Sequence, residues 1–126
     1  MQTVELTDEN FEATISDNDI VLVDFWADWC APCRQFGPIF EKSAQDNPEI
    51  VHGKLDTEAA RRVAAAAGIT AIPTLMAFRE GVLVFNQAGA LPAPALAQVV
   101  EGVKSLDMKE IHADIAAQAD GSVPEE

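Results

Sequence analysis

The fold is decided by the stretch Val21-Leu22-Val23-Asp24-Phe25-Trp26-Ala27-Asp28-Trp29-Cys30-Ala31-Pro32-Cys33, which holds both cysteines of the chain. Its first half is apolar apart from Asp24, a pattern typical of a strand that is covered on both faces. Pro32 suits the first turn of a helix, where its missing N–H group would have no partner in any case. Cys30 and Cys33 are three positions apart, so we expect them on one face at the start of a helix.

The bulk composition indicates one domain with an acidic surface. The chain has 126 residues, with 8 basic and 21 acidic side chains and a formal net charge of −13. This charge repels nucleic acids and anionic membranes, so neither is an expected partner, and solubility explains it best. No leader and no run of eighteen apolar residues is apparent. Two closely spaced cysteines without a secretory signal then indicate a reducing, cytoplasmic location.

Strands and helices alternate along the rest of the chain, which predicts an α/β domain with a mixed sheet. Expected strands are residues 3–6, 20–26, 50–55, 75–79 and 82–87, the last two forming an antiparallel hairpin. Expected helices are residues 8–16, 31–46, 58–67 and a last helix that Pro92 begins. Thr7 is expected to cap the first of these, and Gly68 to end the third. Pro38 removes a backbone donor within 31–46, so a kink is expected to divide that helix into two segments.

The C-terminal residues differ in character from the rest. Residues 107–126 contain six acidic side chains and one lysine, with a weak apolar stripe of Met108, Ile111 and Ile115. We expect a loose helix followed by disorder from Gly121. The chain is therefore divided into a catalytic domain, residues 1–106, and an acidic extension, residues 107–126.

Thiol–disulfide exchange is the chemistry that the cysteine pair favours. A helix N-terminus stabilises a thiolate, so Cys30 is the expected nucleophile and the more exposed sulfur. Cys33, one turn further in and more buried, would resolve the mixed disulfide. Asp24 is the candidate acceptor for the Cys33 proton, because burial should raise its pKa towards neutrality. Alternatively, Asp24 is a structural acid paired with a backbone amide or with Lys54, which could equally be a plain surface lysine.

Two other interpretations of the cysteines have less support. The first is a zinc site, of which the two cysteines would supply half of the ligands. The other candidate ligands are His52 and His112, and both are expected to be solvated and idle, so no metal is expected. A permanent structural disulfide closing so short a loop would add little stability.

The motifs together closely resemble thioredoxin. They comprise residues 25–33, then Gly68-Ile69, Ile72-Pro73-Thr74 and Gly89-Ala90. The likeness covers about residues 1–106 and excludes the acidic extension. Residues that depart from the family pattern include Ala31, where glycine is usual, and Ala67, where an aromatic residue often stands.

The resemblance implies a thioredoxin fold, with a mixed central sheet flanked by helices on both faces. It implies that Cys30 attacks, that Cys33 resolves, and that the two form a redox-active disulfide, with Asp24 as the buried acid and Lys54 its neighbour. It further implies a cis Ile72–Pro73 bond and an apolar client-binding rim, made of Trp29, Ile72, Pro73 and Gly89. Trp26 is assigned to packing.

The implied function is reduction of protein disulfides by a monomeric enzyme that binds no cofactor. The resemblance also implies that the electrons come from NADPH through a flavin-containing thioredoxin reductase. Two alternatives are an oxidase or isomerase with a more oxidising pair, and a chaperone or assembly subunit that uses the same fold for binding.

Overall fold

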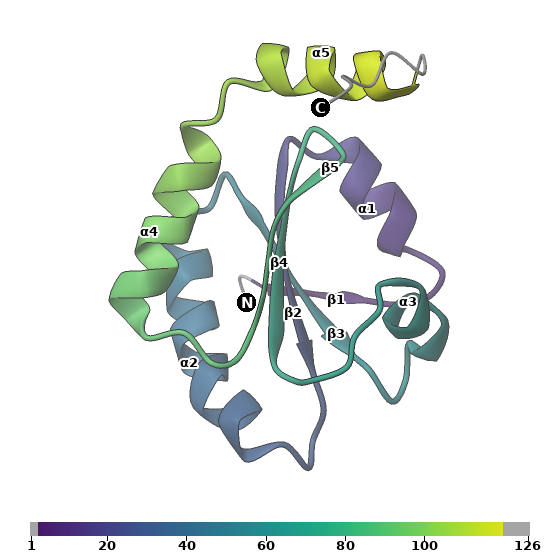
Figure 1. The fold of residues 1–126 in the computed structure, drawn as a ribbon. Coiled ribbons are helices and arrows are strands. Elements are labelled where there is room, and N and C mark those ends of the chain that lie inside the picture. The colour runs from purple at the N-terminus through teal and green to yellow at the C-terminus, as the bar shows by residue number, and fades with distance from the viewer. Residues whose placement is uncertain (1–2, 120–126) are drawn as a thin grey trace.

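The computed structural model describes residues 3–119 and contains one five-stranded mixed sheet at its centre. The sheet has the order β1-β3-β2-β4-β5 (Figure 1). Its strands are β1 (Thr3–Leu6), β2 (Ile20–Trp26), β3 (Val51–Asp56), β4 (Thr74–Arg79) and β5 (Val82–Ala88). Both β1 and β2 run parallel to β3, whereas β4 is antiparallel to β2 and β5. The mixed sheet and the terminal hairpin confirm the predicted fold class.

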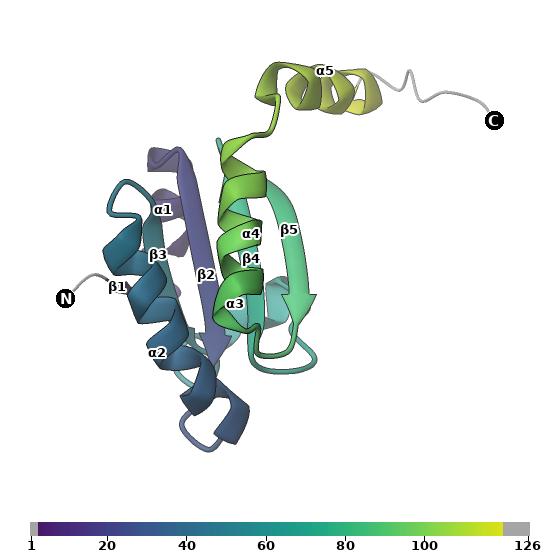
Figure 2. The same ribbon diagram turned by 90° about the vertical axis from the view of Figure 1, so that its left-hand side faces the viewer.

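Helices cover both faces of the sheet (Figure 2). On one face lie α2 (Ala31–Asp46) and α4 (Ala93–Lys104), and on the other lie α1 (Phe11–Asp17) and α3 (Arg61–Ala66). A fifth helix, α5 (Met108–Ala119), follows α4 and crosses the end of the β4–β5 hairpin (Figure 1).

The central strand β2 supplies side chains to two separate cores, because alternate residues of a strand point to opposite faces. Leu22 packs with Phe36 and Phe40 of α2 and with Leu96 of α4. On the opposite face, a second cluster contains Leu6, Ile15, Val21, Val23, Phe25, Leu55, Ala60 and Met76. Burial on both faces explains why the sequence of β2 is nearly continuous apolar.

The prediction that Pro38 divides its helix is wrong, since α2 is one helix from Ala31 to Asp46 with Pro38 inside it. Pro38 is exposed, while Phe36 and Phe40 on either side of it are buried in the core. Packing of these two rings holds the helix together despite the missing backbone hydrogen bond.

Two helices begin later than predicted, each after a turn that a side chain caps. The Thr7 hydroxyl accepts the N–H groups of Glu9 and Asn10, each at 3.2 Å, and the Phe11 N–H donates to the Thr7 carbonyl at 3.1 Å. Thr7 therefore caps the turn that leads into α1, which begins at Phe11. The Asp56 carboxylate likewise accepts the Glu58 N–H at 2.9 Å in the turn before α3, which begins at Arg61.

His52 is fully buried, so the expectation that it is solvated is wrong. Its Nδ1 lies 3.0 Å from the Ile50 carbonyl oxygen and its Nε2 lies 2.9 Å from the Ser43 hydroxyl. The ring packs edge-on against Phe40, and burial lowers the pKa of His52 below its usual value. A neutral imidazole with both nitrogens bonded is therefore part of the core.

The expected tail helix is present as α5, whose Met108 is buried and whose Ile115 remains 42% exposed. His112 is not idle, since its Nε2 lies 2.7 Å from a carboxylate oxygen of Glu80 in the β4–β5 turn. The predicted disorder from Gly121 falls outside the described residues.

Candidate active site

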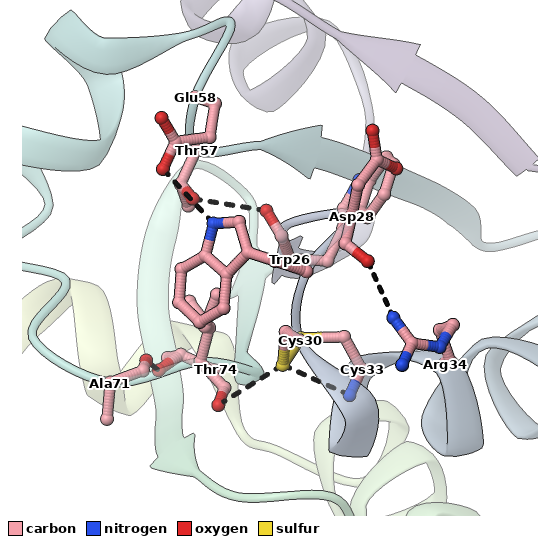
Figure 3. Close-up of a disulfide and its surroundings, with 11 residues drawn as sticks. Trp26, Asp28, Cys30, Cys33, Arg34, Thr57, Glu58, Ala71 and Thr74 are labelled. Atoms are coloured by element: carbon pink, nitrogen blue, oxygen red, sulfur yellow. Dashed lines mark hydrogen bonds between the residues drawn. A yellow bond between two sulfur atoms is a disulfide. The ribbon is translucent and has the colours of Figure 1, made fainter.

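The cysteine pair lies where β2 leads into α2. Cys30 is the N-cap residue of α2, and its sulfur accepts the backbone N–H of Cys33 at 3.2 Å (Figure 3). The two cysteines form a disulfide, with their Cα atoms 5.2 Å apart. Pro32 occupies the first turn, as expected. A sulfur at this end of a helix receives unpaired N–H groups and the positive end of the helix dipole, both of which favour a thiolate.

Exposure does not distinguish the two sulfurs. In the disulfide form Cys30 is 4% exposed and Cys33 is 5% exposed. The prediction that Cys30 is the more accessible residue is therefore wrong for this state. What distinguishes the two cysteines is position, because Cys30 caps the helix and Cys33 lies inside its first turn.

A loop that is remote in the sequence closes over Cys30. The Cys30 sulfur lies 3.7 Å from the Ile72 carbonyl oxygen, and the Ile72–Pro73 bond is cis, as the resemblance implied. Gly89 donates its N–H to the Pro73 carbonyl at 2.7 Å and has a φ of 105°, a region that favours glycine. Ile72, Pro73 and Gly89 are thus gathered beside the disulfide, although the Pro73 ring itself is buried.

The two tryptophans near the cysteines differ in exposure. Trp29 is 68% exposed, and its indole N–H donates to a Glu58 carboxylate oxygen at 3.4 Å. Trp26 is half-buried, and the Lys54 ammonium nitrogen lies 5.1 Å from its ring centroid, within the range of a cation–π interaction. Trp26 therefore packs as expected, and the exposed face of Trp29 leaves it available for the client contact that the resemblance implies.

Asp24 is fully buried at the centre of β2, directly opposite Lys54 of β3 in the parallel register. Neither of its carboxylate oxygens has a hydrogen-bond partner within residues 3–119. Burial raises the pKa of Asp24 to about 7, and the positive charge of Lys54 partly opposes the rise. Lys54 is therefore the neighbour of Asp24, yet it makes no direct bond with the carboxylate.

Two contacts at the site were not anticipated from the sequence. Arg34, the residue after Cys33, donates to the Asp28 carbonyl at 2.7 Å and ties the loop before the cysteines to α2 (Figure 3). Glu58 contacts Trp29 from 29 residues away, a pairing that no local pattern signals. Beside Cys33 an open groove of about 750 Å³ is lined by Trp26, Arg34 and Lys54, among others.

Among residues 3–119, no group of three or more histidine, cysteine or carboxylate side chains is arranged to hold a metal ion. No helix in that part of the chain is long and apolar enough to cross a membrane.

Comparison with known proteins shows relatives that are similar in sequence and solved structures that are similar in fold. Residues 2–102 match the family model described as Thioredoxin. A Streptomyces coelicolor protein named "Putative thioredoxin 2" is 56% identical over 116 residues, which cover 92% of this chain and 87% of that protein. Thioredoxin C-3 of Corynebacterium nephridii is 40% identical over 99 residues, covering 78% of this chain and 68% of the relative.

Solved structures give the same result. A Plasmodium falciparum thioredoxin superimposes with a TM-score of 0.74 at 32% identity, covering 79% of this chain and 98% of that one. From the family match over residues 2–102, the 56% identical relative and the disulfide at the N-terminus of α2, the chain belongs to the thioredoxin family and is a thiol–disulfide oxidoreductase that acts through Cys30 and Cys33.

Proposed function

We propose that the protein works as a reductase of protein disulfides, with Cys30 as nucleophile and Cys33 as resolving residue. The Cys30 thiolate attacks one sulfur of a client disulfide, and the other client sulfur leaves as a thiolate. Cys33 then loses its proton and attacks the Cys30 sulfur, which releases the second client thiolate. The client gains two electrons, and the enzyme is left with the Cys30–Cys33 disulfide.

One observation carries the assignment of roles. The Cys30 sulfur already accepts the Cys33 N–H at the N-terminus of α2, so negative charge on this sulfur is stabilised before a client arrives. Cys33 lies three residues further on, inside the first turn of α2, and its sulfur is bonded to that of Cys30. Capture by Cys30 and release by Cys33 follow from this order.

Asp24 is the proposed acceptor of the Cys33 proton. A carboxyl group with a pKa of about 7 is partly ionised at neutral pH and is therefore able both to take up and to return a proton. Lys54 acts as a positioning residue, because its charge limits how far burial raises the pKa of Asp24.

Clients are proposed to bind across the rim formed by Trp29, Ile72, Pro73 and Gly89. Trp29 offers an exposed apolar surface, and the backbone around the cis bond lies within reach of a client that is attached to Cys30. An extended client could hydrogen-bond to this backbone in the manner of an added strand.

The electron donor and the setting are proposed from family membership. A flavin-containing, NADPH-dependent thioredoxin reductase would restore the dithiol, and the enzyme would act as a monomer in the cytoplasm. Residues 1–106 are proposed as the catalytic domain and residues 107–126 as an acidic C-terminal extension.

Insulin reduction tests the proposal. The full chain is assayed with NADPH and thioredoxin reductase, beside Cys30→Ser and Cys33→Ser variants. We expect turnover with the wild type, no reaction with Cys30→Ser, and a trapped mixed disulfide with Cys33→Ser that mass spectrometry maps to Cys30. Turnover by Cys30→Ser, or a mixed disulfide formed through Cys33 in preference to Cys30, would contradict the assigned roles.

A further inference from the structure

The outer edge of β5 stands out in a strongly acidic protein because it carries no charge. Residues 81–100 contain no Asp, Glu, Lys or Arg, although the whole chain has 29 such residues among 126. Within this segment Leu83 is 45% exposed, and residues 86–90 are all exposed. The surface of β5 is therefore neutral while the protein as a whole carries a charge of −13.

The same strand is an open sheet edge. β5 pairs with β4 on one side, and within residues 3–119 no strand pairs with it on the other (Figure 2). A bulge near Ala77 and Phe78 disturbs the register of its first half, but Phe85–Ala88 pairs regularly with β4. The other edge strand, β1, is only four residues long and carries an exposed Glu5, two features that discourage pairing. β5 is seven residues long, Val82–Ala88, and has no charged side chain, so it has neither protection.

Apolar grooves adjoin β5 on both faces of the sheet. On the α1/α3 face, a groove has an apolar floor that includes Phe11, Phe78 and Leu83, and its charged lining residues are Asp8, Glu9, Glu12 and Arg62, with a net negative charge. On the α4 face, a second groove is lined by Phe85, Leu91 and Val99. A strand added to this edge would direct alternate side chains to opposite faces, and each set would meet one of the two grooves.

The edge also leads to the active site. Ala88 ends β5, and the next residue, Gly89, is hydrogen-bonded to Pro73 of the cis-proline loop beside Cys30. The C-terminal end of β5 therefore lies next to the cis-proline loop, while its free edge faces away from β4.

We propose that the β5 edge, Phe85–Ala88, is a docking strand for an extended, uncharged segment of a client protein that is flanked by lysine or arginine. The partner's identity as a client rests on the proposed function. A neutral segment can pair with the uncharged strand without burying an unpaired charge. Lysine or arginine on either side of that segment would be attracted to the acidic surface of the protein, which includes the exposed Glu9 and Glu12 in the lining of the first groove. A second copy of the chain fits less well, because each copy carries a net charge of −13 and the two would repel each other as they approach, although the β5 edge itself is neutral.

The test uses the oxidised full chain and a cysteine-free peptide, Lys-Thr-Val-Thr-Val-Thr-Lys, so that no thiol exchange takes part. Amide hydrogen exchange and chemical shifts are followed by NMR. We expect slower exchange at those amides of Phe85–Ala88 that do not bond to β4. N-methylation of alternate peptide amides should weaken binding at least about fivefold, because two backbone hydrogen bonds are lost.

A matched pair of variants separates docking from net charge. Asn86→Lys places a cation on β5 and should weaken peptide binding at least about fivefold, whereas Ala97→Lys, on an exposed position of α4, should leave it unchanged. Shifts confined to the active-site rim, or no shifts at millimolar peptide, would overturn the proposal. Protection of β5 without peptide, together with a doubled mass in light scattering, would overturn it in favour of a second copy. Insulin reduction is unaffected by these outcomes and tests the proposed function separately.

Discussion

The buried carboxyl group of Asp24 makes a quantitative prediction about stability. Its pKa is about 7 in the folded protein, against an ordinary 3.8. The folded state therefore binds more protons than the unfolded state between about pH 4 and pH 7, and stability falls as the pH rises through this range. The difference in pKa corresponds to about 4 kcal/mol, since a tenfold change in an equilibrium constant is about 1.4 kcal/mol.

Asp24→Asn removes the titrating group and keeps the shape of the side chain. The free energy of unfolding of the variant, minus that of the wild type, should rise by about 4 kcal/mol from pH 4 to pH 8. The buried amide of the variant also lacks partners, which costs about 1–3 kcal/mol, but this cost does not change with pH. The slope of the difference, rather than its value at one pH, is therefore the quantity that tests the argument.

Guanidinium chloride unfolding of the oxidised proteins at pH 4, 5, 6, 7 and 8 measures that slope. Lys54→Met gives a second arm, because loss of the neighbouring positive charge should raise the pKa of Asp24 further and extend the decline in stability to higher pH. Parallel pH profiles for wild type and Asp24→Asn would show that the carboxyl group is not desolvated in the folded protein, and the reasoning would be refuted.

Three more predictions concern the core and the reaction. Gly53→Ala would place a Cβ 2.7 Å from Leu6 Cγ, and we expect a loss of about 1–3 kcal/mol in denaturant unfolding, with no loss if Leu6 moves freely. Burial lowers the pKa of His52, so its own contribution to stability is lost on acidification, opposite in sign to that of Asp24; the free energy of unfolding of His52→Phe minus that of the wild type should therefore rise from pH 7 to 5, and a difference independent of pH would contradict this. Asp24→Asn should slow release by Cys33 about a hundredfold more than capture in rapid-quench experiments, and equal slowing would argue against the proton-acceptor role.

Strands β1 and β2 and helix α2 have the bounds that the sequence predicts. For β2 and α2 the reason is a long apolar or amphipathic run with a strong period. The starts of α1 and α3 were each predicted three residues too early, because the turns that Thr7 and Asp56 cap precede these helices. Buried rings keep α2 continuous through Pro38.

Burial was harder to predict than secondary structure. His52 has a polar side chain on a strand, and only its position between α2 and the sheet places both ring nitrogens against partners. The two cysteines were assigned different exposure from their order in the helix, yet both are almost fully buried in the disulfide form, and the cis-proline loop contacts Cys30.

The sequence by itself determined the reacting groups: two cysteines one helical turn apart, a proline that starts the helix, and an acid within an apolar strand. These features are local, so a few consecutive residues are enough to specify them. Only the tertiary structure decided the surroundings, namely Ile72 beside Cys30, Lys54 beside Asp24, and an uncharged β5 at the sheet edge. Those pairings join residues far apart in the chain, and they depend on the order in which the strands assemble rather than on any local pattern.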